Sequence, residues 1–493
     1  MNKFKKFLKN NRLLIIILIL GFILRTYRAQ ELFMYGHDQD LAGWFVKDIV
    51  ENRHLRLIGQ ETSTQGIFIG PIYYYLLVPF YLISNMDPIG GVVMITVLGM
   101  FSIWSFYYVF KKVFSKREGL IATFIYAVSF YTIFNDREVA PTMPVIVWTV
   151  WYFYGLNLFL KGKQKKGFLV VGILIGLIWH LNMALVLLLP LIFLSIWFSK
   201  KKIRPKQLLH GLFAMLTLSL PLILFEMRHG FSQVKAFILS LTTDQHAIVS
   251  GFEQFKRTIH LLSKNADGLI WGSIQPVSYE TTTLLLLLLF LYLVYKKIIK
   301  KHLAIIFSSW LVLYVGFFSV YSKNLSEYYL NGTILLWILI LTLGISHLFS
   351  KQKLKNYGIG ILVIFSILNL IRFFNIEINR SGYLERKAII AEIKHNAGNQ
   401  NYPCIAISYI TKPGYDLGYR YLFWLEKLHV NRPKSESPVY TIVYPLRRDI
   451  KVHKTFGAIG LIYPEYSRYT KEGIEESCSG ENQNLTESMY GMP

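Results

Sequence analysis

The sequence predicts a polytopic α-helical membrane protein with a small α/β domain after its helices. Two observations carry this prediction. Of the 493 residues, 53% are hydrophobic and only 17% are charged, and mean hydropathy is +0.38, as is typical of membrane proteins. The formal charge of +24 lies in short basic clusters between apolar runs, like the signals that orient membrane helices. A soluble globular enzyme is excluded, and we interpret the charge as topology rather than nucleic-acid binding.

The N-terminal region predicts the first membrane helix. Residues 1–12 hold five Lys and Arg residues and precede the apolar run Leu13 to Leu24. This run is similar to a signal peptide, but Arg25-Thr26-Tyr27-Arg28 follows it without an Ala-x-Ala cleavage site. We expect an uncleaved transmembrane helix with a cytoplasmic N-terminus.

Basic clusters indicate the side of each later loop. The segments 111–118, 161–167, 199–206, 296–302 and 350–356 hold four, four, five, four and three Lys and Arg residues. The short loops 135–141 and 321–328 hold one each. Because cytoplasmic loops carry the basic excess, the first set is predicted to be cytoplasmic and the second external. The chain is expected to be a multi-pass plasma-membrane protein.

Two segments are ambiguous, and the sidedness of their flanking loops decides them. Residues 70–84 would reach only about 22 Å as a helix, against a hydrocarbon core of about 30 Å, so we expect a juxtamembrane or re-entrant external helix. Residues 168–198 lie between two cytoplasmic clusters and should form a hairpin with its tip at His180-Leu181-Asn182. About eleven spans result, the others being near 13–24, 89–110, 119–134, 142–160, 207–226, 281–295, 303–320, 329–349 and 357–375.

Odd parity places the C-terminal region, 376–493, outside, and separates it from a membrane module, 1–375. Its mixed composition predicts helices at 383–397 and 417–429 and strands at Cys404–Ile410 and Val439–Tyr444. This alternation is typical of a small α/β domain. Cys404 and Cys478 can form one disulfide if the region is extracellular. The polar residues from about 470 are expected to be disordered.

Two long external loops, 29–66 and 227–280, carry apolar residues at helical spacing. In the first, Leu41, Trp44, Phe45 and Ile49 form one face of a helix that starts at an acidic pair. In the second, the corresponding face is Phe231, Val234, Phe237, Ile238 and Leu241. We expect amphipathic helices on the membrane surface that shape a groove.

The acidic pair Asp38 and Asp40 is the first candidate for chemistry. An external carboxylate in a partly wet pocket is ionised near pH 7 and can accept a proton from a hydroxyl group. The alternative is that one of the two caps the helix that follows, since Asp is a common N-cap residue.

Asp136-Arg137-Glu138 is the second candidate, in the external loop 135–141. Three charges between two apolar helices can offer an acid and a base to a polar substrate. The alternative is a local ion pair at a helix end, which contributes little when exposed.

Two further polar groups are expected on the same face. His180 and Asn182 lie at the hairpin tip, where polar side chains tend to face a cavity, although an interhelical hydrogen bond is the alternative. Arg228 and His229 end another span, where Arg228 can bind a phosphate or anchor at the lipid headgroups. We expect Asp38, Glu138, His180 and Arg228 to line one cavity open to the outside.

Motifs for nucleotide, redox and zinc-protease chemistry are missing: there is no Walker-type loop, dinucleotide glycine fingerprint, paired CxxC or His-Glu-x-x-His. The chain is therefore expected to use a pre-activated substrate delivered in the membrane.

Three motifs in this order resemble GT-C fold glycosyltransferases of the protein O-mannosyltransferase and aminoarabinose transferase type. They are Leu24-Arg25-Thr26-Tyr27-Arg28, His37-Asp38-Gln39-Asp40 and Gly70-Pro71-Ile72-Tyr73-Tyr74-Tyr75, followed by a charged second loop and an external C-terminal domain. The resemblance covers roughly residues 10–375. It implies transfer of a sugar, with inversion, from a polyprenyl-phosphate donor to a hydroxyl group of a glycan, lipid or protein.

The resemblance also implies residue roles. The family's first-loop acid, a catalytic base or acidic ligand, matches Asp38 best and Asp40 next. Its second-loop acid maps onto Glu138 or Asp136, because this chain has Asp-Arg-Glu there. Arg228, His180 and Arg137 are candidates to stabilise the phosphate, and a divalent metal is used by some members and not by others.

Two other functions fit the same sequence. A transporter or flippase of lipid-linked saccharides would share the spans and the external charges, but it would line both halves of a path with polar residues. An assembly factor without activity is the third possibility, against which the intact acidic loop argues.

Overall fold

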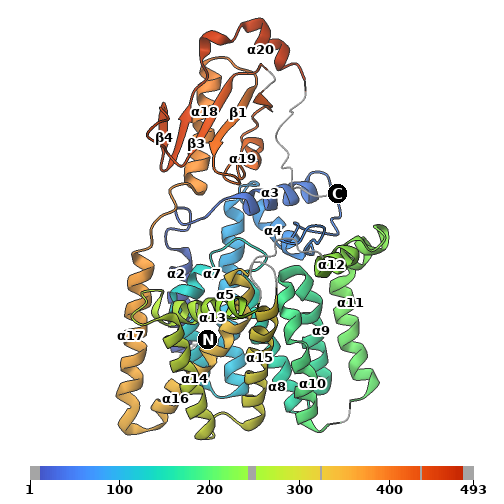
Figure 1. Cartoon of the computed structure of the whole chain (residues 1–493), viewed down its shortest axis with the longest axis vertical. Coiled ribbons are helices and arrows are strands. Elements are labelled where there is room, and N and C mark those ends of the chain that lie inside the picture. Colours follow the sequence, from blue (N-terminus) through green and yellow to red (C-terminus); the bar gives the residue numbers. More distant parts are fainter. Residues whose placement is uncertain (1–10, 202, 243–250, 322–324, 434–435, 481–493) are drawn as a thin grey trace, which may run out of the picture.

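The computed structural model describes residues 11–201, 203–242, 251–321, 325–433 and 436–480. Figure 1 shows a bundle of helices with a sheet domain at one end, and α3 (His37–Val50) and α4 (Ile72–Ile83) between the two. The turns between α10 and α11 and between α16 and α17 lie at the opposite end of the bundle (Figure 1). These turns carry two of the basic clusters, so basic clusters and sheet domain lie at opposite ends.

The bundle is built from apolar helices joined by short connections. Its elements are α2 (Arg12–Thr26), α5 (Ile89–Val113), α6 (Lys116–Val128), α7 (Phe130–Asn135), α8 (Val145–Leu160), α9 (Gln164–Leu181), η1 (Met183–Leu188), α10 (Pro190–Ser199), α11 (Pro205–Arg228), α14 (Tyr279–Tyr295), α15 (Lys301–Val320), η2 (Glu327–Thr333), α16 (Ile334–Ser350), η3 (Gln352–Leu354) and α17 (Lys355–Phe374). Their facing sides form one apolar core centred on aromatic and aliphatic side chains such as Trp148, Trp310 and Trp337.

Six helical segments in the described part of the chain are long and apolar enough to cross a membrane. They are Ile89–Val113, Gln164–Leu181, Pro205–Arg228, Lys301–Val320, Glu327–Ser350 and Gln352–Phe374. Shorter apolar helices cover Ile72–Ile83, Val145–Leu160, Met183–Ser199 and Tyr279–Tyr295. The protein is thus a helical membrane protein, while eleven spans remain a prediction.

The expected hairpin over 168–198 is formed by α9 and the returning pair η1 and α10. The first arm, α9, also packs on α11, and the two backbones approach each other closely where Gly172 meets Gly211. A Cβ atom added at Gly172 would lie 2.1 Å from the Gly211 carbonyl oxygen, so only glycine permits this approach. Small residues at such contacts are typical of membrane helix packing.

The expected single span 119–134 is broken into α6 and α7 at Ser129. The break is stabilised from outside, because the Ser129 hydroxyl donates to the Leu269 carbonyl at 2.8 Å and the Phe130 amide donates to Asn369 Oδ1 at 2.8 Å. Leu269 belongs to α13 (Phe252–Trp271), which also packs on α14 and α15. The second external loop therefore starts from a short helix that two neighbours fix in place.

Within residues 29–66, the helix α3 forms at the expected place. This helix is packed against other parts of the protein on its apolar face. Nine of its fourteen residues are buried, and Trp44 packs edge-on against Tyr421 of the sheet domain, with ring centroids 5.8 Å apart. The apolar face predicted to lie on the membrane surface contacts protein instead: Trp44 packs on the C-terminal domain and Phe45 on Tyr74 of α4. In the second loop, α12 (Ser232–Thr242) does leave Val234 and Phe237 exposed; part of that loop, 243–250, and the Leu241 side chain lie outside the description.

The C-terminal domain holds a five-stranded sheet in the order β2-β1-β3-β5-β4. Its elements are α18 (Tyr383–Asn399), β1 (Ile405–Thr411), α19 (Arg420–Leu425), β2 (Val430–Asn431), β3 (Val439–Tyr444), β4 (Lys454–Phe456), β5 (Ile459–Ile462), η5 (Tyr466–Arg468) and α20 (Lys471–Ser477). β1 pairs in parallel with β2 and β3, with Ala406 opposite Val439, and β5 is antiparallel to β3 and β4.

The apolar core of this domain does not stop at its boundary. One cluster of buried residues joins Ile389 and Ile442 of the domain to Phe45, Tyr74 and Leu77 of α3 and α4. Disorder from about residue 470 was the wrong expectation for 471–480, because α20 forms there and Cys478 pairs with Cys404 in a disulfide. Residues 481–493 lie outside the described range.

Candidate active site: two carboxylates in a recess

Asp38 lies in the first turn of α3 and is exposed to solvent. Among the described residues, none forms a hydrogen bond with its carboxylate. Asp38 does not cap its own helix: the Gly36 amide at the helix start donates to Gln39 Oε1 at 3.0 Å. The surrounding protein nevertheless displaces bulk water, and this desolvation raises the pKa of Asp38 above its ordinary value, against a smaller lowering by His37. Exposure with desolvation indicates a concave, wet recess.

Glu138, from the loop after α7, has the same character. Its side chain is exposed and forms no hydrogen bond within the described part of the chain. Desolvation raises its pKa, and the negative charge of Asp38 raises it further. The structure therefore brings the two loops together, with a carboxylate from each close enough to interact electrostatically.

Gln39 joins the two loops directly. Its Nε2 donates to the Val139 carbonyl oxygen at 3.1 Å, while its Oε1 accepts from the Gly36 amide. Since Gln39 follows Asp38 and Val139 follows Glu138, this bond holds the backbone segments that carry the two acids beside each other. Sequence reasoning did not single out Gln39.

Asp40 lies in a different environment, although it is only two residues from Asp38. It is fully buried, accepts from the Tyr35 hydroxyl at 3.0 Å, and accepts from the Tyr421 amide at 3.2 Å. Tyr421 is in the first turn of α19, so Asp40 caps a helix of the C-terminal domain rather than its own. The geometry places Asp40 outside the recess.

Asp136 is also buried, at 1% exposure. Its Oδ2 pairs with Arg25 Nη2 at 2.6 Å and its Oδ1 accepts from the Tyr126 hydroxyl at 2.7 Å. Neighbouring Arg137 donates to the carbonyl oxygens of Leu24 and Tyr27 at the end of α2. Both residues bind the second loop to the first helix, so the local ion-pair alternative describes Asp136, although its partner is 111 residues away.

His180 and Asn182 do not reach the recess. His180 is fully buried, with Nε2 2.9 Å from the Leu218 carbonyl oxygen of α11 and Nδ1 accepting from the Ile72 amide. Asn182 Oδ1 caps η1 through the Ala184 amide. The interhelical hydrogen bond, which was the alternative reading of His180, is the observed one.

Arg228 and His229 lie elsewhere again. They line a small pocket together with residues 54–58 and Phe225, and His229 stacks on Phe225 with ring centroids 4.1 Å apart. His180 and Arg228 therefore do not share a cavity with the acids, whereas Asp38 and Glu138 lie close enough to interact electrostatically; that the two acids line one cavity stays a prediction. The distribution of Lys and Arg among the loops predicted that all four residues lie on one side of the membrane, but it contains no information on how far apart they lie along that side.

Two tyrosines that sequence reasoning did not assign a role accompany the acids. Tyr73 of α4 interacts electrostatically with both Asp38 and Glu138, and its hydroxyl is buried without a hydrogen-bond partner in the described structure. Tyr328 of η2 interacts with Asp38 in the same way. Tyr73 belongs to the Gly70-Pro71 motif, where its repeated tyrosines were a signal.

A metal ion would find oxygen ligands here. No group of three or more His, Cys, Asp and Glu side chains suited to a metal occurs among the described residues. Two unpaired carboxylates in a wet recess fit a hard divalent cation whose other ligands are water and phosphate oxygens, as Mg²⁺ prefers. Asp38 and Glu138 are the residues that would hold it.

Comparisons with known proteins agree with this architecture. The family model described as dolichyl-phosphate-mannose-protein mannosyltransferase matches residues 69–225, less than half of the chain. Among curated protein sequences, none matches.

Among solved structures, ArnT from Cupriavidus metallidurans bound to undecaprenyl phosphate superposes with a TM-score of 0.59 at 10% identity, over 93% of this chain and 99% of that one. Its apo form gives 0.57 at 10% identity, over 93% and 98%. The Archaeoglobus fulgidus oligosaccharyltransferase with Zn and sulfate gives 0.51 at 12% identity, over 87% and 67%. The chain therefore has the GT-C fold of these membrane glycosyltransferases, as its motifs predicted.

Proposed function

We propose that this chain is a membrane glycosyltransferase that moves a sugar from a polyprenyl-phosphate-linked donor to an acceptor hydroxyl group. One observation carries the proposal: two carboxylates without hydrogen-bond partners in the described structure, Asp38 and Glu138, lie close enough to interact electrostatically in a chain with the GT-C fold. The solved relative bound to undecaprenyl phosphate supports the donor class. The mannosyltransferase family match supports the reaction class.

The two acids suit a single displacement with inversion. The Asp38 carboxylate takes the proton of the acceptor hydroxyl group as the acceptor oxygen bonds to the anomeric carbon. The bond from that carbon to the phosphate oxygen breaks, and polyprenyl phosphate leaves with the bonding electron pair. Because desolvation raises the pKa of Asp38, its carboxylate is a stronger base than an ordinary aspartate.

Glu138 holds the acceptor in line by accepting a hydrogen bond from a second hydroxyl group. A divalent cation held by the two carboxylates would neutralise charge on the leaving phosphate when bound. We assign the protein's own contact with that phosphate to Lys264 of α13. Its Nζ is 2.5 Å from Glu327 Oε1, and Glu327 adjoins Tyr328, which interacts with Asp38.

The proposed enzyme and a flippase differ in whether the donor bond is cleaved. The protein reconstituted in liposomes is given a polyprenyl-phosphate mannose, and free polyprenyl phosphate is measured by mass spectrometry. We expect release by the wild type, less release by Glu138→Gln, and unchanged release by Asp449→Asn, an exposed acid paired with Arg447. Movement of intact donor between leaflets without release, across a panel of lipid-phosphate sugars, would contradict the proposal.

A further inference from the structure

A cavity of about 350 Å³ lies beside the recess, between the membrane module and the C-terminal domain. Four segments enclose it: residues 32–39 before and at the start of α3, the second loop with α7, the linker 373–381 after α17, and residues 386 and 414–417 of the C-terminal domain. Its volume is at the lower end of the range for small-molecule sites, about 300–1,000 Å³. It suits a ligand of one or two sugar rings rather than a folded protein.

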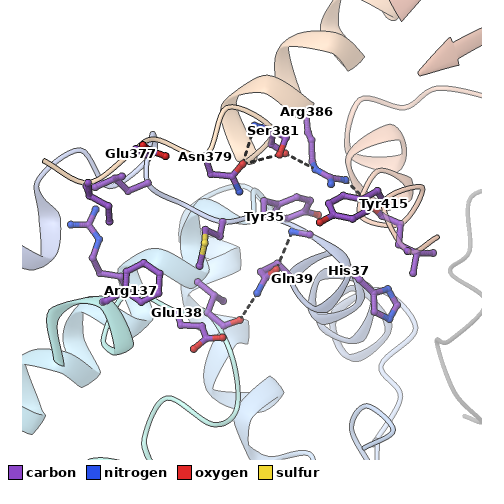
Figure 2. A pocket seen from close by; sticks show the side chains of 18 of the residues that line it. Tyr35, His37, Gln39, Arg137, Glu138, Glu377, Asn379, Ser381, Arg386 and Tyr415 are labelled. Carbon is purple, nitrogen blue, oxygen red and sulfur yellow. Dashed lines mark hydrogen bonds between the residues drawn. The ribbon is translucent and has the colours of Figure 1, made fainter. Parts of the chain in front are cut away.

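The cavity opens onto the proposed chemistry. Glu138 and His37 belong to its wall, and these two residues interact electrostatically with Asp38. Figure 2 shows Arg137 and Glu138 on one side of the cavity and Glu377, Asn379, Ser381 and Arg386 on the opposite side. A ligand in the cavity therefore has one end at Glu138, the acid that interacts electrostatically with Asp38, and the other at the C-terminal domain.

Charged groups in the wall are balanced. Arg137 and Arg386 are its cations and Glu138 and Glu377 its anions, so the wall has no net charge to favour a phosphate or a carboxylate. The other polar groups are amides, hydroxyls and an imidazole, which donate to and accept from hydroxyl groups equally well. This chemistry fits a neutral polyol.

Aromatic rings complete the wall. Tyr415 is 43% exposed and sits on the loop 412–418, where its ring contacts Tyr444 with centroids 5.0 Å apart. The loop is held by Arg386, which donates to the carbonyl oxygens of Leu417 at 2.7 Å and Ser381 at 3.1 Å. A fixed, exposed ring beside balanced hydrogen-bonding groups can pack on the apolar face of a sugar while its hydroxyl groups are bound.

We propose that this cavity is the acceptor subsite and that it binds a neutral saccharide unit. Glu377 of the linker and Tyr415 of the C-terminal domain determine which saccharide the subsite accepts. The inference rests on the proposed function, since it names the acceptor class of that reaction. The C-terminal domain is then part of the substrate site rather than an appendage.

Binding without donor tests the proposal independently of catalysis. The full-length protein in lipid nanodiscs is titrated with methyl α-mannopyranoside, methyl β-glucopyranoside and methyl β-galactopyranoside, and binding is followed by saturation-transfer difference NMR. We expect at least one glycoside to bind, and Tyr415→Ala to weaken that binding about tenfold, as loss of one packed ring does. Glu377→Gln should weaken it as well, and this exposed substitution leaves the cavity's packing intact.

Tyr466→Ala is the matched control, because Tyr466 is 39% exposed on the same domain but outside the cavity. Its binding should equal that of the wild type. A parallel titration with the octyl glycosides distinguishes two sources of the saccharide. Tighter binding of the octyl form indicates a lipid-linked saccharide, and equal binding of the methyl and octyl forms indicates a free glycan.

Two results would overturn the acceptor-subsite proposal: no glycoside binding by the wild type, or equal binding by the wild type, Tyr415→Ala and Glu377→Gln. The binding titration contains no donor, so its outcome does not depend on catalysis. Absence of donor cleavage in liposomes would overturn the proposed function, whereas the binding result would still test whether the cavity binds a saccharide.

Discussion

Residues 29–66 and the loop 135–141 each contain a pair of acids two residues apart, and the structure treats the two pairs alike. Asp38 and Glu138 are exposed, their carboxylates form no hydrogen bonds in the described structure, and the two interact electrostatically. Asp40 and Asp136 are buried with partners on both carboxylate oxygens; in Asp40 the Tyr421 amide lies within hydrogen-bond distance of both oxygens. One acid of each loop is thus available for chemistry and the other holds its loop in place.

The loops differ in what the buried acid is anchored to. Asp40 caps α19 of the C-terminal domain, whereas Asp136 pairs with Arg25 of the first helix. The recess is therefore positioned from two sides, by the sheet domain above α3 and by the membrane bundle below α7. Spacing alone does not reveal this division, since both pairs have the same spacing.

The largest expected effect is on the anchor within the bundle. Asp136→Asn leaves the Arg25 guanidinium buried without a counter-charge, which typically costs about 3–5 kcal/mol. We expect a large fall in the unfolding temperature of the purified protein and in the folded yield. The matched control is Asp449→Asn, whose exposed pair should leave both unchanged; an equal effect of the two substitutions would contradict the anchoring role of Asp136.

A smaller loss of stability is expected at the other anchor. Asp40→Ala removes the acceptor for the Tyr421 amide and the Tyr35 hydroxyl, at a cost of about 1–2 kcal/mol. The change should appear as faster limited proteolysis of the C-terminal domain. Asp38→Ala, two residues away, should not increase proteolysis, since its carboxylate has no hydrogen bond to lose; equal sensitivity of the two variants would remove the distinction between them.

The sequence predicted the elements well and their partners poorly. The hairpin tip at His180 and the strand Val439–Tyr444 were confirmed because hydrophobic period and turn residues are local properties. The contacts of Asp40 and Asp136 were not predicted, since their partners Tyr421 and Arg25 lie far away in sequence and only tertiary packing decides which acid is buried.

The same limit explains the errors in the site. His180 and Arg228 do not have the neighbours that were predicted, because charge parity predicts the side of the membrane on which a residue lies and not its lateral position. The apolar face of α3 was assigned to lipid, since a sequence pattern cannot distinguish lipid from the apolar surface of another domain. Gln39 and Tyr73 lie within motifs that the sequence shows, but the motifs do not reveal their roles, which appear only from their contacts.

The smallest expected effect concerns the pH dependence of donor cleavage. Asp38 acts as a carboxylate, and its pKa is raised by desolvation, so activity should be lost as pH falls through a value above the ordinary range of Asp. Glu138→Gln removes a neighbouring negative charge, which lowers the pKa of Asp38, because the coupling between the two acids is reciprocal. The acid limb of its residual activity should therefore move to lower pH by a fraction of a unit. A shift to higher pH would contradict the coupling.

The most direct test of the central claim compares the two acids of α3 by donor turnover per folded molecule. Release of polyprenyl phosphate is measured for Asp38→Asn and Asp40→Asn in nanodiscs, with folded protein quantified by size-exclusion chromatography. Loss of a general base predicts a fall of about 10²- to 10⁴-fold for Asp38→Asn, while Asp40→Asn keeps most of the wild-type rate. Wild-type turnover by Asp38→Asn would contradict the account.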